Sequence, residues 1–109
     1  MNDSIGTTGD SATKPDGGGK PIIRVLEICN KKGLHARASA KFAQLVDQYD
    51  AALKDTRGAE TVGGNSIMGL MMLAAGHGTS ITVEATGPQA ADVIEALTTL
   101  VSGRFTEDE

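Results

Sequence analysis

Residues 33–42 are Gly33-Leu34-His35-Ala36-Arg37-Ala38-Ser39-Ala40-Lys41-Phe42. From Ala36 onward the apolar residues recur at the spacing of one α-helix face, and Tyr49 is the last of them. A polar loop that ends at Gly33 comes before this pattern. The stretch therefore predicts a helix from residue 36 to about residue 50, with His35 directly in front of it.

The remaining segments predict four strands and two more helices. Alternating or β-branched apolar residues predict strands over 22–29, 51–56, 60–62 and 80–86. An almost wholly apolar segment, 67–75, predicts a short helix, and 88–102 predicts a last helix with Pro88 at its first position and Gly103 after its end. The order β-α-β-β-α-β-α predicts an α+β fold: an open-faced two-layer β-sandwich whose four-stranded antiparallel sheet is covered on one face by three helices.

The two ends of the chain differ from its centre. Residues 1–20 are rich in Gly, Ser and Thr, and Ile5 is their only large aliphatic residue after the first Met, so we expect a disordered N-terminal tail. Residues 21–105 are predicted to form one domain. Residues 106–109 are predicted to form an acidic C-terminal tail.

The composition excludes several classes of function. A formal net charge of −4 argues against binding to nucleic acid, because phosphate binding requires clustered Lys and Arg. One cysteine and two histidines supply neither a disulfide within the chain nor a zinc-ligand cluster, so we expect no metal and no cofactor. The sequence has no run of about 18 apolar residues, so we expect no membrane insertion and a cytoplasmic protein.

His35 stands where binding of an anion is favoured. A helix N-terminus leaves backbone N–H groups unpaired and carries about half a positive charge. A phosphoryl group on the His35 ring would meet these amides, and the forked guanidinium of Arg37 would reach the same oxygens. The alternative interpretation is that His35 only caps the helix and that Arg37 is solvated surface.

The quoted residues 33–42 resemble the active-site signature of HPr, the histidine-containing phosphocarrier protein of the phosphoenolpyruvate-dependent phosphotransferase system. The resemblance extends from about Pro21 to Phe105 and includes the order of the predicted elements. It implies a monomeric phosphoryl carrier, not a turnover enzyme, which accepts a phosphoryl group from enzyme I and passes it to an enzyme II A component. The resemblance implies that His35 is the phosphorylated residue and that Arg37 is its phosphate partner.

Ala38 departs from the family pattern, since many members have proline after the motif arginine. Alanine restores an N–H that proline lacks, so the anion site gains a donor and loses some rigidity. Ala-Ser at this place resembles branches tied to nitrogen-related or regulatory phosphotransferase chains. The downstream acceptor therefore stays open between sugar transport and a regulatory output.

A second segment, which begins with Asn65-Ser66-Ile67, resembles the regulatory-serine segment of the family. In some bacteria a dedicated serine kinase/phosphorylase modifies this serine, and a phosphate on Ser66 would face the free amides of a helix start. A plain N-cap also accounts for Ser66, because serine there is worth about 0.5–2 kcal/mol over alanine.

The helix after Ser66 has too little polar surface for a solvated helix. We expect Ile67, Met68 and Met71 to dock partners, because a small domain has little room to bury every side of such a helix and methionine adapts to different partners. Core packing is the alternative for these residues, and Leu70, Leu73 and Ala74 are predicted to be core. His77, in a glycine loop, is predicted to be surface.

Two further classes of function were weighed against a phosphoryl carrier. The first is a regulatory binding module of a nitrogen-related chain, in which the phosphorylation of His35 or Ser66 controls affinity for a sensor or regulator. The second is a hydrolase that uses His35 as a base, which fits poorly because the sequence offers no Ser/Cys partner motif and no metal cluster.

Overall fold

The computed structural model describes residues 20–106, and the statements below refer to this part of the chain. Its elements, in chain order, are β1 (Ile22–Glu27), α1 (Ala36–Val46), β2 (Ala52–Arg57), β3 (Glu60–Gly63), α2 (Ile67–Met72), β4 (Ser80–Thr86), α3 (Ala90–Ser102) and the 3₁₀ helix η2 (Arg104–Thr106). This is the predicted order, with η2 added at the end. Residues 1–19 and 107–109, predicted as tails, lie outside the described residues.

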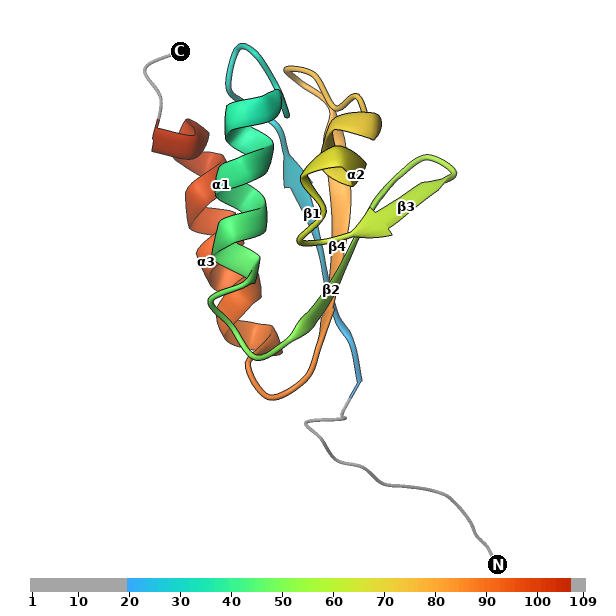
Figure 1. The fold of residues 1–109 in the computed structure, drawn as a ribbon, viewed down its shortest axis with the longest axis vertical. Helices are drawn as coiled ribbons and strands as arrows, with labels where there is room; N and C mark the ends of the chain where they lie inside the picture. The colour runs from blue at the N-terminus through green and yellow to red at the C-terminus, as the bar shows by residue number, and fades with distance from the viewer. Residues whose placement is uncertain (1–19, 107–109) are drawn as a thin grey trace, which may run out of the picture.

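The strands form one antiparallel sheet in the order β1-β4-β2-β3. The register places Ile22 of β1 and Leu53 of β2 on either side of Ala85 in β4. The three helices lie on one side of this sheet, and α1 and α3 run along it next to each other (Figure 1). The predicted α+β fold, an open-faced two-layer sandwich, is confirmed.

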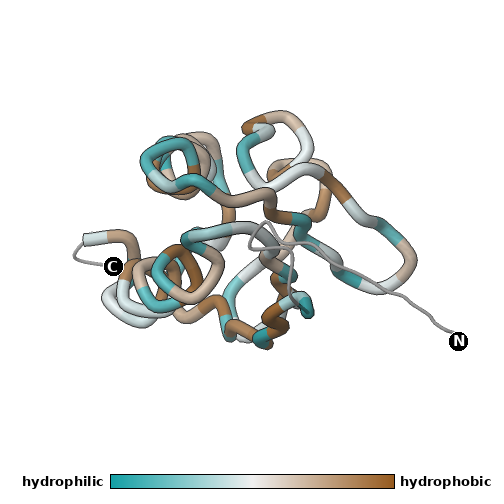
Figure 2. Tube along the Cα trace, turned by 90° about the horizontal axis from the view of Figure 1, so that it is seen from below, coloured by the Kyte–Doolittle hydropathy of each residue, from teal (hydrophilic) through white to brown (hydrophobic). Residues whose placement is uncertain are grey.

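The core lies between the sheet and the helices and is mainly aliphatic. Alternate residues of β4 point into it, as the clean alternation of 80–86 predicts, and both phenylalanines, Phe42 and Phe105, are fully buried. Figure 2 looks along the helices and shows hydrophobic and hydrophilic residues on the same coils. The helices are therefore amphipathic, and the sheet face that they leave uncovered exposes Ile23 and Val25.

Two helices end earlier than predicted. α1 ends at Val46, not near Asp50, because the amides of Gln48 and Tyr49 donate to carbonyls three residues back and tighten the chain into turns. α2 ends at Met72, with Leu73 as its C-cap. Ala74, predicted to be core, is exposed and has a left-handed backbone with a φ of 53°, so the chain leaves the helix there.

The last helix begins two residues after Pro88, so the prediction of proline at its first position is wrong. Its N-cap is Gln89, whose side-chain oxygen accepts a hydrogen bond from the Asp50 amide at 2.7 Å. The Gln89 amide donates in return to the Asp50 carbonyl at 3.0 Å. A contact with a distant loop therefore sets the start of α3. Its end at Gly103 is as predicted.

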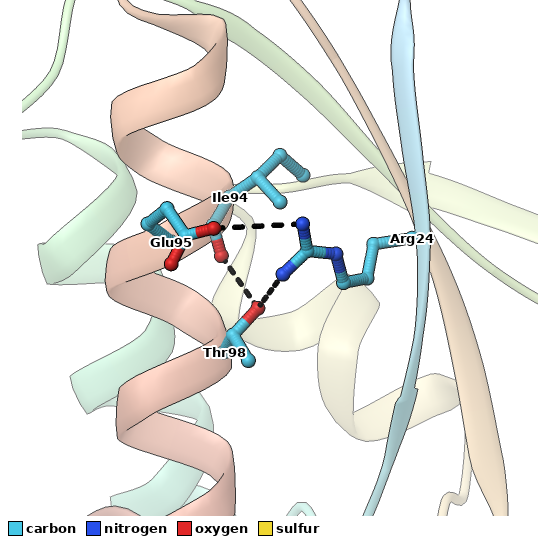
Figure 3. A network of polar contacts seen from close by, with 4 residues as sticks. All are labelled: Arg24, Ile94, Glu95 and Thr98. Carbon is cyan, nitrogen blue, oxygen red and sulfur yellow. Dashed lines mark hydrogen bonds and ion pairs between the residues drawn. The ribbon is translucent and has the colours of Figure 1, made fainter.

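Arg24 of β1 links this strand to α3 through polar contacts (Figure 3). The Arg24 guanidinium donates to the Thr98 hydroxyl at 3.0 Å and lies 3.5 Å from the Glu95 carboxylate. Thr98 in turn donates to the Ile94 carbonyl, one helical turn earlier. These contacts are partly exposed, so they fix the position of the helix more than they add stability.

The described chain closes with a turn that packs on α1. Arg104, Phe105 and Thr106 all have left-handed backbones, with φ values of 57°, 57° and 61°. The Lys41 ammonium of α1 donates to the Phe105 carbonyl at 2.6 Å and to the Thr106 hydroxyl at 3.0 Å. This lysine therefore holds the turn that places Phe105 in the core.

Asp55 is the most unusual residue of the sheet, because it is a buried acid without a partner. It is fully buried on the helix-covered face of β2, where the register places it between Val62 of β3 and Val83 of β4. Within residues 20–106 neither of its carboxyl oxygens has a hydrogen-bond partner. Desolvation raises the pKa of Asp55 from 3.8 to about 7.

Candidate functional site

The loop in front of α1 is braced by buried polar groups. The Asn30 side chain donates to the Gly33 carbonyl at 2.9 Å, and the Ser39 hydroxyl donates to the Leu34 carbonyl at 3.2 Å. Both side chains are fully buried. Gly33 has a φ of +66°, the left-handed region that favours glycine. The position of His35 is thus set by residues around it that sequence reasoning did not assign to the site.

The same loop lies directly on the backbone that follows α2. A Cβ atom at Gly33 would collide with the Ala75 carbonyl oxygen and would come within 2.7 Å of the Gly76 Cα. The Leu34 amide donates to that same Ala75 oxygen at 2.9 Å. The start of α1 and the end of α2 therefore meet at one end of the molecule (Figure 1).

His35 is the N-cap of α1, as the sequence predicts. Its backbone is extended, with a φ of −76° and a ψ of −178°, and its ring is half-buried. Ring nitrogen Nδ1 accepts a hydrogen bond from the Arg37 amide at 3.2 Å. Nδ1 therefore directs its lone pair at the helix start, where the positive end of the helix dipole and the first amides favour an anion.

Arg37 and Ala38 lie in the first turn of α1 on different faces. Arg37 is exposed, and within the described part of the chain no carboxylate forms an ion pair with its guanidinium. Ala38 is fully buried, so its methyl packs into the core while its amide belongs to the N-terminal turn. Alanine thus keeps the small apolar contact and leaves one more N–H at the helix start.

Ser66 is the N-cap of α2, also as the sequence predicts. Its backbone is extended, and its hydroxyl oxygen accepts a hydrogen bond from the Gly69 amide at 3.0 Å. The preceding Asn65 side chain donates to an Asp47 carboxylate oxygen at 2.9 Å, which ties this loop to the end of α1. The geometry satisfies an ordinary cap and leaves the hydroxyl half-buried.

α2 turns much of its apolar surface to solvent. Its exposed large apolar side chains are Ile67, Met68, Met71 and Met72, of which Met68 is 71% exposed. Leu70 and Leu73 are core, as predicted, whereas Ala75 takes the buried place expected for Ala74. His77 is exposed, as predicted. An apolar helix face of this kind, next to the His35 loop, is typical of a protein interaction site.

The described residues offer little else that could bind a cofactor. Among residues 20–106 no group of three His, Cys, Asp or Glu side chains is arranged to hold a metal ion. No helix of this part of the chain is long and apolar enough to cross a membrane. The site at the start of α1 consists of a half-buried histidine next to the first amides of the helix, an exposed arginine and an apolar helix.

Comparison with known proteins gives the family. The model of the PTS-HPr family, described as the PTS HPr component phosphorylation site, matches residues 22–103. The chain belongs to the HPr family. These proteins are phosphocarriers of the phosphotransferase system, as the sequence of the His35 loop predicts.

Named relatives fall into two groups within this family. Phosphocarrier protein HPr of Neisseria meningitidis is 50% identical over 84 residues, which cover 77% of this chain and 94% of the relative. Phosphocarrier protein NPr of Shewanella violacea is 39% identical over 86 residues, which cover 79% of this chain and 94% of the relative.

Solved structures of HPr proteins also match this chain. HPr-C-His from Thermoanaerobacter tengcongensis superposes with a TM-score of 0.77 at 32% sequence identity, and the match covers 81% of this chain and 99% of that one. Both the HPr and the NPr groups contain relatives of this chain, so family membership establishes a phosphocarrier without naming its acceptor.

Proposed function

We propose that His35 receives a phosphoryl group from phosphorylated enzyme I on Nδ1 and passes it to an enzyme II A-type acceptor. In the first step a P–N bond forms at Nδ1 while the bond between phosphorus and the donor atom breaks, and the electron pair stays with that donor atom. The second step reverses this at the acceptor. The protein is restored after each cycle and acts as a carrier, not as a turnover enzyme.

The observation that carries this proposal is the 3.2 Å contact between Nδ1 and the Arg37 amide. It aims the lone pair of Nδ1 at the helix N-terminus, where a phosphoryl group would find backbone N–H donors in place. The charge that arrives with the phosphoryl group is favoured there by the helix dipole. The exposed Arg37 guanidinium adds a charge-assisted bond to the phosphoryl oxygens.

The apolar face of α2 supports docking of both partners. Ile67, Met68 and Met71 are exposed, and α2 ends against the His35 loop through the bond from Leu34 to Ala75. A partner that covers these side chains would also cover the His35 ring. One apolar face thus serves the donor and the acceptor in turn, and flexible methionines adapt to each.

A regulatory function of the same surface is favoured by the geometry of Ser66. A phosphate on its hydroxyl would lie next to the Gly69 amide and beside the apolar docking face, so a serine kinase/phosphorylase could weaken partner binding through the added charge. Mass analysis after incubation with such a kinase should locate the phosphate on Ser66. Unmodified Ser66 after this treatment would remove the regulatory function from the proposal.

The carrier function is tested with the chain's own two histidines. Incubation with phosphoenolpyruvate and enzyme I should give an acid-labile phosphohistidine in the native chain and in His77→Ala, but not in His35→Ala. His77 is the matched control because it is an exposed histidine outside the helix start. Labelling that persists in His35→Ala, or that is lost in His77→Ala, would exclude the assignment.

A further inference from the structure

The backbone just after α2 supports the loop that carries His35. Leu34, the residue before His35, has its amide bound to the Ala75 carbonyl, and Gly33 packs on the backbone of residues 75 and 76. Any movement of residues 73–76 would therefore move the N-cap of α1. The contacts of this backbone with Gly33 and Leu34 are made by backbone atoms, and the Ser39 hydroxyl of α1 binds the loop separately, at the Leu34 carbonyl.

The turn at the end of α2 is positioned by the burial of Leu73 and Ala75 in the core, and a hydrogen bond from outside the helix adds to this. The last turn of a helix leaves carbonyl oxygens without partners within the helix, and Leu73 is the C-cap of α2. Ala74 then adopts a φ of 53°, a conformation that costs about 1 kcal/mol or more for a residue with a Cβ. α2 itself has only six residues, so its own hydrogen bonds cannot fix this turn.

Arg57, the last residue of β2, provides this contact. Its guanidinium nitrogen Nη1 donates to the Leu73 carbonyl at 3.2 Å. Glu60 lies opposite Arg57 in the register of β2 and β3, yet within residues 20–106 the only ion pair joins Arg24 to Glu95. A positive charge at a helix C-terminus is also favoured by the helix dipole.

We propose that Arg57 is a positioning residue for phosphoryl transfer, which holds the Leu73 carbonyl and so fixes the turn that supports the His35 loop. The chain of contacts is Arg57 to Leu73, then through Ala74 to Ala75, and from Ala75 to Leu34. The inference rests on the proposed carrier function of His35. It assigns Arg57 no contact with the phosphoryl group.

The sequence offers a matched control in Arg24. Both arginines lie in strands and donate from the guanidinium to a helix, Arg24 to α3 and Arg57 to α2. Arg24 acts on the side of the domain that does not support the His35 loop. Arg57→Met and Arg24→Met therefore both remove a strand guanidinium, the first from its contact with the C-cap of α2 and the second from its contact with α3.

The first measurement is amide hydrogen exchange in the full chain without any partner. Arg57→Met should speed exchange of the Leu34 amide about three- to tenfold relative to the β4 amides, the size expected for loss of one partly exposed hydrogen bond. Arg57→Lys should recover part of the protection, because an ammonium can still donate to Leu73. Arg24→Met should leave the Leu34 amide as in the native chain.

The second measurement is the rate of phosphorylation by limiting enzyme I. Arg57→Met should be about three- to tenfold slower than the native chain, with Arg57→Lys between the two and Arg24→Met unchanged. Exchange at Leu34 that stays native in Arg57→Met, or that rises equally at Leu34 and in β4, would overturn the inference. Absence of labelling in the native chain would instead refute the carrier function, while the exchange result would still report on Arg57.

Discussion

The position of His35 is set mainly by hydrogen bonds of the residues around it. Asn30 and Ser39 bind the carbonyls of the two residues before it, and the Leu34 amide binds Ala75. The ring itself contributes the bond from Nδ1 to the Arg37 amide. A histidine held in this way needs little reorganisation when a phosphoryl group arrives, which is the usual benefit of a preorganised site.

Asp55 should make the stability of the domain depend on pH. Its pKa is raised from 3.8 to about 7 in the folded chain, so folding favours the protonated form. The free energy of unfolding should fall as the pH rises from about 4 to about 7 and stay lower above that range, by up to about 4 kcal/mol from this group. Asp55→Val, which matches Val62 and Val83 beside it, should remove this loss.

Urea denaturation of the native chain and of Asp55→Val at pH 5 and pH 8 gives the measurement. The difference in unfolding free energy between the two proteins should grow at pH 8 in favour of the variant. Equal differences at both pH values would show that Asp55 finds a partner for its charge.

At the scale of single residues, the sequence predicted a reactive histidine but not the residues that support it. The residue pattern predicted an anion site at a helix start, and the resemblance of residues 33–42 to the HPr signature gave His35 and Arg37 their predicted roles. Arg57 and Lys41 carry no such pattern, since each acts on a carbonyl distant in the sequence. The alternation of residues in β2 does not show whether an acid such as Asp55 is paired with another group.

α2 is a short helix whose position depends on packing against its neighbours. It has six residues, a serine cap, one buried side chain, Leu70, and an exposed apolar group. A helix this short is held by packing against the sheet and α1. Gly69 has no side chain, and this matters for the packing, because a Cβ atom there would come within 2.8 Å of the Val62 Cβ in β3.

Met68 should contribute to partner binding without contributing to folding. It is 71% exposed on α2, so Met68→Glu places a charge on the proposed docking face at little cost to stability. The dissociation constant for enzyme I, measured by calorimetry, should rise at least about tenfold. Ile23→Glu, at a side chain 61% exposed on the open face of the sheet, is the control and should bind as the native chain does. Equal loss of affinity in both variants would argue against α2 as the docking surface.

The existence and order of the elements were predictable, whereas several of their ends were not. Residue periodicity predicted most strands and the two long helices, and the almost wholly apolar segment 67–75 predicted α2. The ends depend on contacts across the fold, as when Gln89 and Asp50 start α3, or on a backbone turn, as when Ala74 leaves α2. The 3₁₀ helix at 104–106 lacks periodicity altogether, and its left-handed residues are not glycines.

The core of the domain is small, so the residues that the C-terminal turn adds to it matter for stability. Phe42 and Phe105 are its two phenylalanines, and both are fully buried among aliphatic side chains. Phe105 comes from a left-handed turn that Lys41 holds against α1. The C-terminal turn thus completes the helical layer and is joined to α1, the helix that His35 caps.

Phe105→Ala should therefore destabilise the domain by about 3–5 kcal/mol, a large part of the roughly 5–15 kcal/mol available to a domain of ordinary stability. Phe105→Leu should cost less, because it keeps most of the buried apolar volume. Urea denaturation at pH 5, where the Asp55 charge is mostly suppressed, measures both. A loss below about 1 kcal/mol for Phe105→Ala would mean that the turn opens easily in the native chain.

A phosphoryl carrier of the proposed kind holds its phosphoryl group on Nδ1 of His35. Nuclear magnetic resonance of the chain labelled with ¹⁵N in histidine, after phosphorylation by enzyme I, tests it through the phosphorus–nitrogen coupling. We predict coupling to Nδ1 of His35, together with shifts of the Arg37 and Ala38 amides as they bind the phosphoryl oxygens. Coupling to Nε2, or phosphorus on His77, would contradict the account.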